Sequence, residues 1–338
     1  MKARAAVATG EPAVAPKGVG SSTFATAEQG ALGDLARVVQ SSAYPRLANP
    51  QVSLTFESQK QVSQNVIDVT FEQLDRYDYE YEGGRTPTEG EPTFIAEKYP
   101  RVVQFELVNG SWKVSKTHAQ TAARPELEPP ENFTSTTFNA PDMGGAPVNA
   151  QTEDAASNVT PQPQSNAAAA TTRSRAKFRD YALKHAYNYN PSYRDFGGIL
   201  SGGDCTNFVS QALRHGGFSY WSYGKSPTSN GVWWYDHDGS DSWSHSWTVA
   251  NNFYWFSRNS GRATVVSSVN DLLWGDVVQI NFQPQSNSTL DHTLAVTAKS
   301  NGVIYVSSHT SDYANKRMGQ VMADNPGAWY SRLKFRYT

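Results

Sequence analysis

A stretch of unusual composition in the middle of this chain predicts two domains. Residues 119–172 are rich in Pro, Ala, Thr, Asn and Gln, with the runs PELEPP (125–130), TPQPQ (160–164) and AAAA (167–170). Such a segment buries too little apolar surface to offset the conformational entropy lost on ordering. We interpret it as a linker, and we predict one domain over residues 1–118 and a second over residues 173–338.

The overall composition limits the class of protein. The chain has 338 residues, of which 38% are hydrophobic, enough for one large core or two modest ones. Its net charge of -2 offers no long-range attraction to a polyanion, so no nucleic-acid partner is expected. No apolar run reaches the roughly 20 residues that a membrane-spanning helix needs. The first ten residues lack the apolar core of a signal peptide, which fits a cytoplasmic protein or a secreted one without its leader.

The first domain is predicted to combine a helix with a half-buried sheet. Apolar spacing predicts the helix over residues 27–40, and apolar–polar alternation predicts strands over 66–71 and 77–81. Residues 102–108 and 111–115 form a predicted hairpin around Asn109-Gly110, since these two residues accept the positive φ angles of a type I′ turn. We predict a small α+β accessory domain.

The second domain reads as helices followed by strands. The predicted helices cover residues 174–189, 204–213 and 247–256, with Gly216-Gly217 ending the second one. The predicted strands cover residues 276–282, 292–298, 303–308 and 333–337, with an Asn301-Gly302 hairpin turn. This order predicts an α+β domain with an antiparallel sheet.

The chain has one cysteine, Cys205, so it has no intramolecular disulfide and no multi-thiolate zinc site. Cys205 follows Gly202-Gly203-Asp204 at the start of a predicted helix, where free backbone N–H groups and the helix dipole stabilise an anion. We expect this position to lower the pKa of the thiol and to make Cys205 a nucleophile. The alternative is an inert buried thiol.

A cysteine nucleophile needs a base and a group that orients the base. His292 opens a predicted strand after a polar loop, so it is the candidate base. His309 ends the next strand of the predicted hairpin and is the candidate orienting residue, with Asp291 and Asn315 as rivals. The other histidines show no partner spacing and no His-Glu-x-x-His pattern, so we predict no metal site.

With these residues in view, the run GDCTNFVSQAL (203–213) strongly resembles the "putative amidase domain" family of secreted and cell-surface proteins of Gram-positive bacteria. Further matching segments are Trp274-Gly-Asp276, His292-Thr-Leu-Ala-Val296 and Ser308-His-Thr310. The resemblance covers about residues 175–338 and is more distantly similar to NlpC-type peptidases and CHAP amidases. It implies a papain-like cysteine hydrolase domain.

The same resemblance implies a role for each site residue. Cys205 is the nucleophile, His292 the base and His309 the third polar residue. The oxyanion hole would use the Cys205 backbone N–H with Tyr187 or Asn190, and Asp204 is a further supporting residue.

The predicted function is amide-bond hydrolysis through a thioester, on cell-wall peptides such as those of peptidoglycan, without a metal or organic cofactor. The resemblance places the protein outside the cell or in the cell envelope. Two alternatives stay open: an acyltransferase or transpeptidase on the same fold, and a non-catalytic cell-wall-binding module. The latter would use aromatic residues that either line a cleft or pack a long loop, namely Trp221, Trp233, Trp234, Tyr235 and Trp243.

Overall fold

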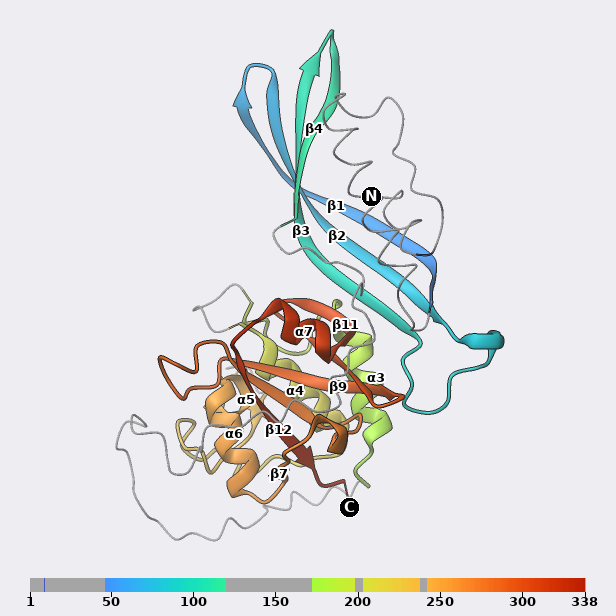
Figure 1. Ribbon diagram of the computed structural model, residues 1–338. Helices are drawn as coiled ribbons and strands as arrows, with labels where there is room; N and C mark the ends of the chain where they lie inside the picture. Colours follow the sequence, from blue (N-terminus) through green and yellow to red (C-terminus); the bar gives the residue numbers. More distant parts are fainter. Residues whose placement is uncertain (1–8, 10–45, 120–171, 198–202, 238–241, 338) are drawn as a thin grey trace. The chain divides into compact units, whose positions relative to one another are not determined.

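The computed structural model describes residue 9 and residues 46–119, 172–197, 203–237 and 242–337 (Figure 1). The predicted helix over 27–40 and nearly all of the predicted linker lie outside these residues, and the domain boundaries stay predictions. The described residues divide into two compact units. One contains residues 46–119, and the other contains the residues from 172 onward except Ser311–Tyr313.

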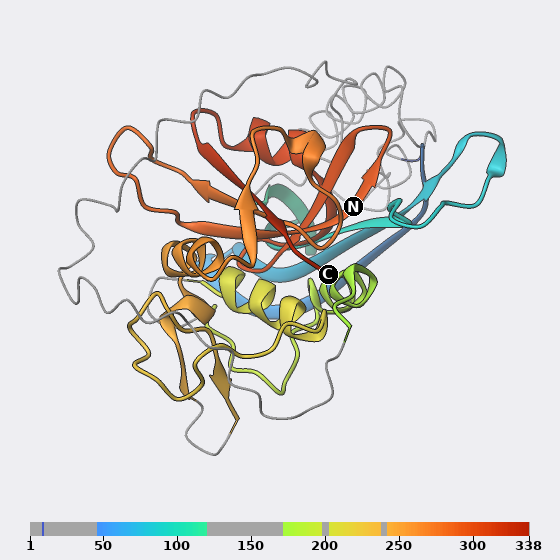
Figure 2. The same ribbon diagram turned by 90° about the horizontal axis from the view of Figure 1, so that it is seen from below.

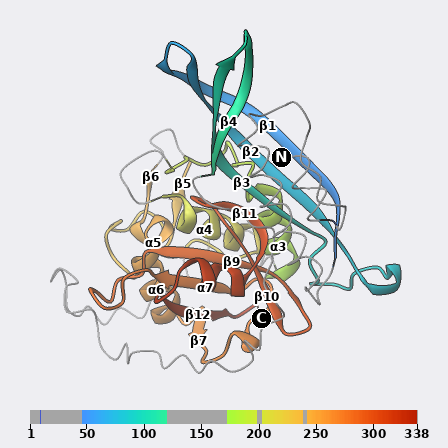
Figure 3. The ribbon, with the colours of Figure 1, turned by 45° about the horizontal axis from the view of Figure 1, so that its top comes forward.

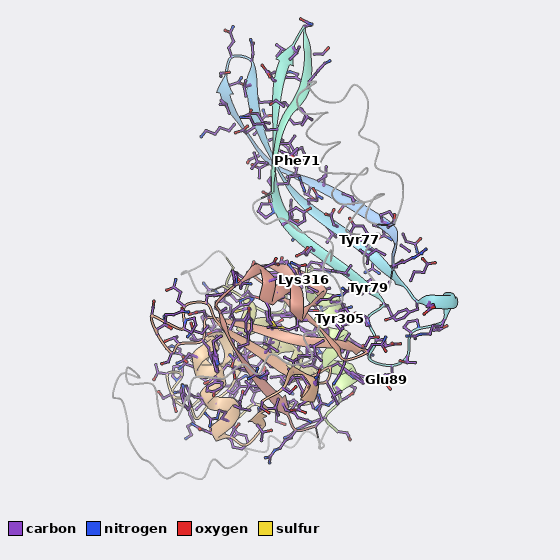
Figure 4. The ribbon with its side chains drawn as sticks, in the orientation of Figure 1. Phe71, Tyr77, Tyr79, Glu89, Tyr305 and Lys316 are labelled. Carbon is purple, nitrogen blue, oxygen red and sulfur yellow. The ribbon has the colours of Figure 1, made fainter. Side chains whose placement is uncertain are left out.

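The first unit is an antiparallel meander, in the order β1-β2-β3-β4. Its strands are β1 (Arg46–Ser63), β2 (Val66–Glu80), β3 (Phe94–Val108) and β4 (Ser111–Ala119). The side chains of Val69, Tyr77 and Tyr79 on one face of β2 are buried, whereas Asp68 and Asp78 stand at alternate positions. Figure 4 shows Tyr77 and Tyr79 on this strand. The expected half-buried sheet is therefore confirmed, with both predicted strand segments lying along one continuous strand.

The predicted hairpin turn joins β3 to β4. Asn109 and Gly110 have φ angles of 50° and 74°, the left-handed conformation that a type I′ turn requires at both central residues. The Asn301-Gly302 turn of the second unit has the same signature, with φ angles of 49° and 82°.

The second unit combines helices with one main antiparallel sheet, as predicted. The helices are α3 (Arg175–His185), α4 (Cys205–His215), α5 (His245–Thr248), α6 (Ala250–Asn259) and α7 (Met318–Asp324). The strands are β5 (Tyr235–Asp236), β6 (Ser242–Trp243), β7 (Ala263–Val265), β8 (Val277–Asn281), β9 (His292–Ser300), β10 (Val303–Ser308), β11 (Asp312–Arg317) and β12 (Trp329–Phe335).

The main sheet of this unit has the order β11-β10-β9-β8-β12-β7, and β5 and β6 form a separate pair. Figure 2 shows α3, α4 and α6 on one side of this sheet, and Figure 3 shows the β5–β6 pair close to α5. The arrangement gives one sheet covered by helices on one face.

The central helix is α4, since every residue from Cys205 to Leu213 is buried. Large side chains from other segments enclose it, including Phe178, Trp233 and Trp247, none of which is exposed. Two of these contacts are polar: Trp233 Nε1 donates to Ser210 Oγ (3.1 Å) and Trp247 Nε1 to Asn207 Oδ1 (2.7 Å). Because α4 is enclosed on all sides, its first residue occupies a fixed position.

Two predicted helices differ from the structure in their bounds. The helix predicted over 174–189 ends at His185, because the following segment is rich in Asn and ends in Pro191, which disfavours a helical residue before it. The helix predicted over 247–256 is two helices, since Val249 takes an extended conformation (φ -109°, ψ 123°) between α5 and α6.

Candidate active site

Cys205 is the first residue of α4 and is buried. Gly203, two residues earlier, has a φ of +70°, and a Cβ atom there would lie 2.5 Å from Thr310 Oγ1. The same Oγ1 accepts a hydrogen bond from the Asp204 backbone N–H (2.8 Å). Thr310 has a φ of 78°, which is costly for a β-branched residue. The glycine before the cysteine thus allows the approach that fixes the start of α4.

A hydrogen bond between two threonines ties the start of α4 to the start of β9. Thr206 Oγ1 and Thr293 Oγ1 are 2.8 Å apart, and both side chains are buried. Gln279 on β8 also donates to Thr293 Oγ1 (3.1 Å). Cys205 precedes Thr206 in the chain and His292 precedes Thr293. The Thr206–Thr293 hydrogen bond therefore holds the segment of the predicted nucleophile next to the segment of the predicted base.

The structure reverses our expectation for the pKa of Cys205. Burial raises the pKa of the thiol, and hydrogen bonds from the Thr206 side chain and the Thr293 backbone oppose this effect only in part. Burial in a low dielectric disfavours the charged thiolate, whereas a helix N-terminus favours it only weakly. Desolvation therefore outweighs the helix dipole, and Cys205 is a neutral thiol at rest.

His292 is the first residue of β9 and is almost entirely buried. Its Nε2 lies 2.9 Å from Ser308 Oγ, and the exposed ring of Phe282 lies 5.9 Å from its ring. Burial lowers the pKa of His292 to about 4, so the imidazole is neutral at pH 7. Among the hydrogen bonds of the described residues, none joins His292 to Cys205.

Among the hydrogen bonds of the described residues, none joins His309 to His292, which we expected it to orient. Its Nδ1 lies 2.5 Å from Asp204 Oδ2, and its Nε2 lies 2.7 Å from the backbone oxygen of His185. The ring is stacked between Tyr189 and Phe208, at centroid distances of 3.7 and 4.2 Å. His309 thus holds α3, α4 and the end of β10 together.

The two rival orienting residues are also placed elsewhere. Asp291 Oδ2 accepts from the Phe282 backbone N–H (2.9 Å), and Asn315 Oδ1 accepts from Thr297 Oγ1 (2.8 Å). Among the described residues, the side chain within hydrogen-bond distance of His292 is Ser308, which belongs to the Ser308-His-Thr310 segment.

Asp204 supports the start of α4 as an acceptor. Its Oδ1 accepts from Asn207 Nδ2 (2.8 Å) and from the Phe196 backbone N–H (3.0 Å), and its Oδ2 faces His309. Because it is 1% exposed, these contacts replace water around the carboxylate. Asp204 precedes Cys205 in the chain, so its hydrogen bonds also fix the position of Cys205.

The two residues predicted to complete the oxyanion hole, Tyr187 and Asn190, lie in the segment after α3. Asn190 Nδ2 donates to Tyr181 Oη (2.9 Å), and its Oδ1 accepts from the Ser192 backbone N–H (3.0 Å). Tyr187 is half-buried just beyond the end of α3. Asn190 therefore stabilises the turn after α3.

Part of the aromatic loop packs the domain. Trp233 and Tyr235 are fully buried, and Trp234 is nearly so. Trp221 and Trp243 are half-buried, with Trp221 bridging to Trp233 as a short antiparallel pair. Trp233 packs against α4, since its Nε1 donates to Ser210 Oγ of that helix.

In the part of the chain that the structure describes, no group of three or more His, Cys, Asp or Glu side chains is arranged to hold a metal ion. Across those same residues, no helix is both long and apolar enough to span a membrane.

The sequence of this segment is similar to a known family. Residues 172–333 match the family model described as "Putative amidase domain", the family that the motif resembles. The family description points to amide-bond hydrolysis at a coarse level.

Two relatives come from Bacillus subtilis (strain 168). Uncharacterized protein YhbB is 35% identical over 125 residues, which are 36% of this chain and 36% of that protein. Uncharacterized protein YjcM is 28% identical over 158 residues, which are 44% of this chain and 34% of that protein. The chain thus matches about a third of the length of these curated relatives. No solved structure gives a significant match.

Proposed function

We propose that residues 173–338 form a cysteine-dependent amide hydrolase of papain-like fold, with Cys205 as nucleophile and His292 as general base. One observation carries the proposal. The only cysteine of the chain begins the enclosed helix α4, and the Thr206–Thr293 hydrogen bond holds that point against the start of β9, where His292 stands. The family match supports the same reaction type.

The proposed reaction starts from two neutral groups. The Cys205 thiol gives its proton to His292, and the thiolate attacks the amide carbonyl carbon to form a tetrahedral oxyanion. The oxyanion collapses to a thioester as the C–N bond breaks, and protonated His292 gives its proton to the leaving amine. Water, deprotonated by His292, then releases the carboxylic acid and restores the thiol.

A substrate has to draw the two side chains together, since no hydrogen bond joins them at rest. Catalytic hydrogen bonds often tighten only when substrate is bound, so the resting distance does not speak against the pair. The neutral imidazole of His292 suits this order of events, because a histidine that is already protonated cannot accept the thiol proton.

We propose cell-wall peptides, such as the stem peptides and cross-links of peptidoglycan, as the substrate class, and a location outside the cell or in the cell envelope. The support is the resemblance of the GDCTNF segment to secreted amidases. Residues 46–119 are proposed to act as an accessory module without a part in the chemistry.

The test is cleavage of peptidoglycan-derived peptides, followed by mass spectrometry of the released amines and acids. The wild type is expected to cleave, while Cys205→Ser and His292→Ala fall to the background rate. His245→Ala is the matched control for His292→Ala, because His245 is an exposed histidine of the same unit. Hydroxylamine should divert the acyl group to a hydroxamate in the wild type alone.

Other outcomes separate the rival functions. Equal cleavage by wild type and Cys205→Ser would refute the cysteine mechanism. Acyl transfer to added amines with little hydrolysis would identify a transferase. Binding of cell-wall peptides without turnover, unchanged in Cys205→Ser, would identify a binding module.

A further inference from the structure

We propose that Ser308 is the positioning residue of His292, and that it holds the imidazole in the tautomer with the hydrogen on Nε2. This inference rests on the proposed function, since it assigns Nδ1 of His292 as the atom that takes the thiol proton from Cys205. Ser308 then orients His292, the role that the sequence suggested for His309.

The Ser308 hydroxyl group has two polar neighbours but only one hydrogen to donate. Ser308 Oγ lies 2.9 Å from His292 Nε2 and 2.9 Å from the backbone oxygen of His309. A serine hydroxyl has one hydrogen to donate, and a carbonyl oxygen only accepts. If that hydrogen pointed to His292 Nε2, Ser308 Oγ and the backbone oxygen of His309 would face each other at 2.9 Å with lone pairs only. Both contacts are hydrogen bonds only when Ser308 donates to the carbonyl and Nε2–H donates to Ser308.

The tautomer leaves the second ring nitrogen as the basic one. A neutral imidazole has one N–H, so hydrogen on Nε2 means a lone pair on Nδ1. His292 Nδ1 makes no hydrogen bond to any residue that the structure describes, yet it is not among the fully enclosed polar atoms without a partner. Nδ1 is therefore the nitrogen open to a proton from outside.

The register of the sheet explains why Ser308, and not His309, meets His292. In the β9–β10 pair, Tyr305 lies opposite Ala298, but Val306 lies opposite Val296, so Thr297 is an extra residue on β9. Continued beyond Ser307, this register pairs position 308 with position 294, on the face of His292. A one-residue shift moves every later side chain of a strand to the other face.

His309 is unable to share the task. Its Nε2 faces the acceptor-only carbonyl of His185 and must carry a hydrogen, and its Nδ1 faces the Asp204 carboxylate. Both nitrogens are thus engaged by groups other than His292, and the ring stacks on Phe208 of α4. The role of His309 is to hold Asp204, next to Cys205.

The test reads the tautomer directly, by two-dimensional ¹⁵N–¹H NMR of the full chain with ¹⁵N-labelled histidine. The seven histidines are distinguished by the loss of one signal set in His292→Ala. We expect the wild type to show a protonated Nε2 and an unprotonated Nδ1 for His292 at pH 7. A hydrogen on Nδ1 in the wild type would overturn the inference, whatever the activity.

Variants then test whether the serine is the cause. Ser308→Ala should give a mixture of tautomers and lower kcat about tenfold with little change in KM, the size of one hydrogen bond. Ser308→Thr, which keeps the hydroxyl, should restore the single tautomer. Ser331→Ala is the matched control, because Ser331 is a fully buried serine of the same sheet without a hydrogen-bond partner. An unchanged tautomer in Ser308→Ala would overturn the role of Ser308.

The two proposals fail separately. Because the NMR signal needs no substrate, the tautomer is tested even if no amide is ever cleaved. A correct tautomer in a protein without hydrolase activity would refute the proposed function and leave the Ser308–His292 arrangement standing.

Discussion

Replacing Gly203 with alanine should destabilise the second unit through two effects that can be measured apart. The first is the backbone: with a φ of +70°, an L-residue in the left-handed region costs about 1–2 kcal/mol. The second is steric: the new Cβ would lie 2.5 Å from Thr310 Oγ1 and 3.0 Å from its Cγ2, and overpacking of this kind costs about 1–3 kcal/mol. We expect Gly203→Ala to lower the free energy of unfolding by about 2–5 kcal/mol.

Thr310→Ala separates the two effects. On its own it removes the hydrogen bond from the Asp204 backbone N–H, at a cost of about 1 kcal/mol. In the double variant the clashing atoms are gone, and the nearest remaining one, Thr310 Cβ, lies 3.3 Å from the new methyl group. The double variant should therefore lose about 1–3 kcal/mol less than the sum of the two single variants.

The measurement is urea unfolding followed by tryptophan fluorescence. Eight of the nine tryptophans follow residue 220, with Trp112 the exception, so the signal reports on the second unit. Additive losses in the double variant would show that Thr310 is not the obstacle. A loss below about 1 kcal/mol for Gly203→Ala would refute the left-handed conformation at this position.

Three further predictions follow from the site. Iodoacetamide should alkylate Cys205 slowly at pH 7 and faster only as the pH rises above about 9, because burial raises the pKa of the thiol. An apparent thiol pKa below about 8.5 in the wild type, lost in His292→Ala, would contradict this prediction. His292 has a folded pKa of about 4 against about 6.5 unfolded, so its contribution to stability is complete above pH 6.5 and is lost as the pH falls to 4. Acid unfolding should show a loss of about 3 kcal/mol over this range that is absent in His292→Gln; equal slopes would refute the assigned burial. Phe282→Ala should change the free energy of unfolding by less than about 0.5 kcal/mol, since the residue is 42% exposed. It should raise KM, because the ring lies next to His292. An unchanged KM would exclude a contact between Phe282 and the substrate.

Local patterns carried most of what the sequence predicted correctly. The helix at Cys205 and the turns at Asn109-Gly110 and Asn301-Gly302 depend on residues close together in the chain, and the structure confirms them. The break at Val249 was missed, because a single extended residue leaves no mark in the apolar spacing on either side of it.

The pKa of Cys205 was predicted in the wrong direction for a related reason. The helix start is visible in the sequence, and its dipole does favour the thiolate. The opposing effect is burial of the sulfur, which depends on contacts with segments distant in the sequence, such as Thr293 of β9. A rule based on one helix terminus therefore captures the smaller of the two energies.

The hydrogen-bond partner of His292 depends on Thr297, the extra residue on β9, which the Asn301-Gly302 turn does not predict. Without the bulge, the pairing of Ser300 with Val303 would continue to place position 309 opposite 294, on the face of His292, and His309 would be the natural orienting residue. The extra residue Thr297 is held by two hydrogen bonds, in which its Oγ1 donates to Asn315 Oδ1 (2.8 Å) and accepts from Ser307 Oγ (2.9 Å). Asn315 reaches this position with a φ of 53°, on the next strand along the chain. The choice between Ser308 and His309 is thus made by a polar contact between β9, β10 and β11, and reading it from sequence requires the register of all three strands.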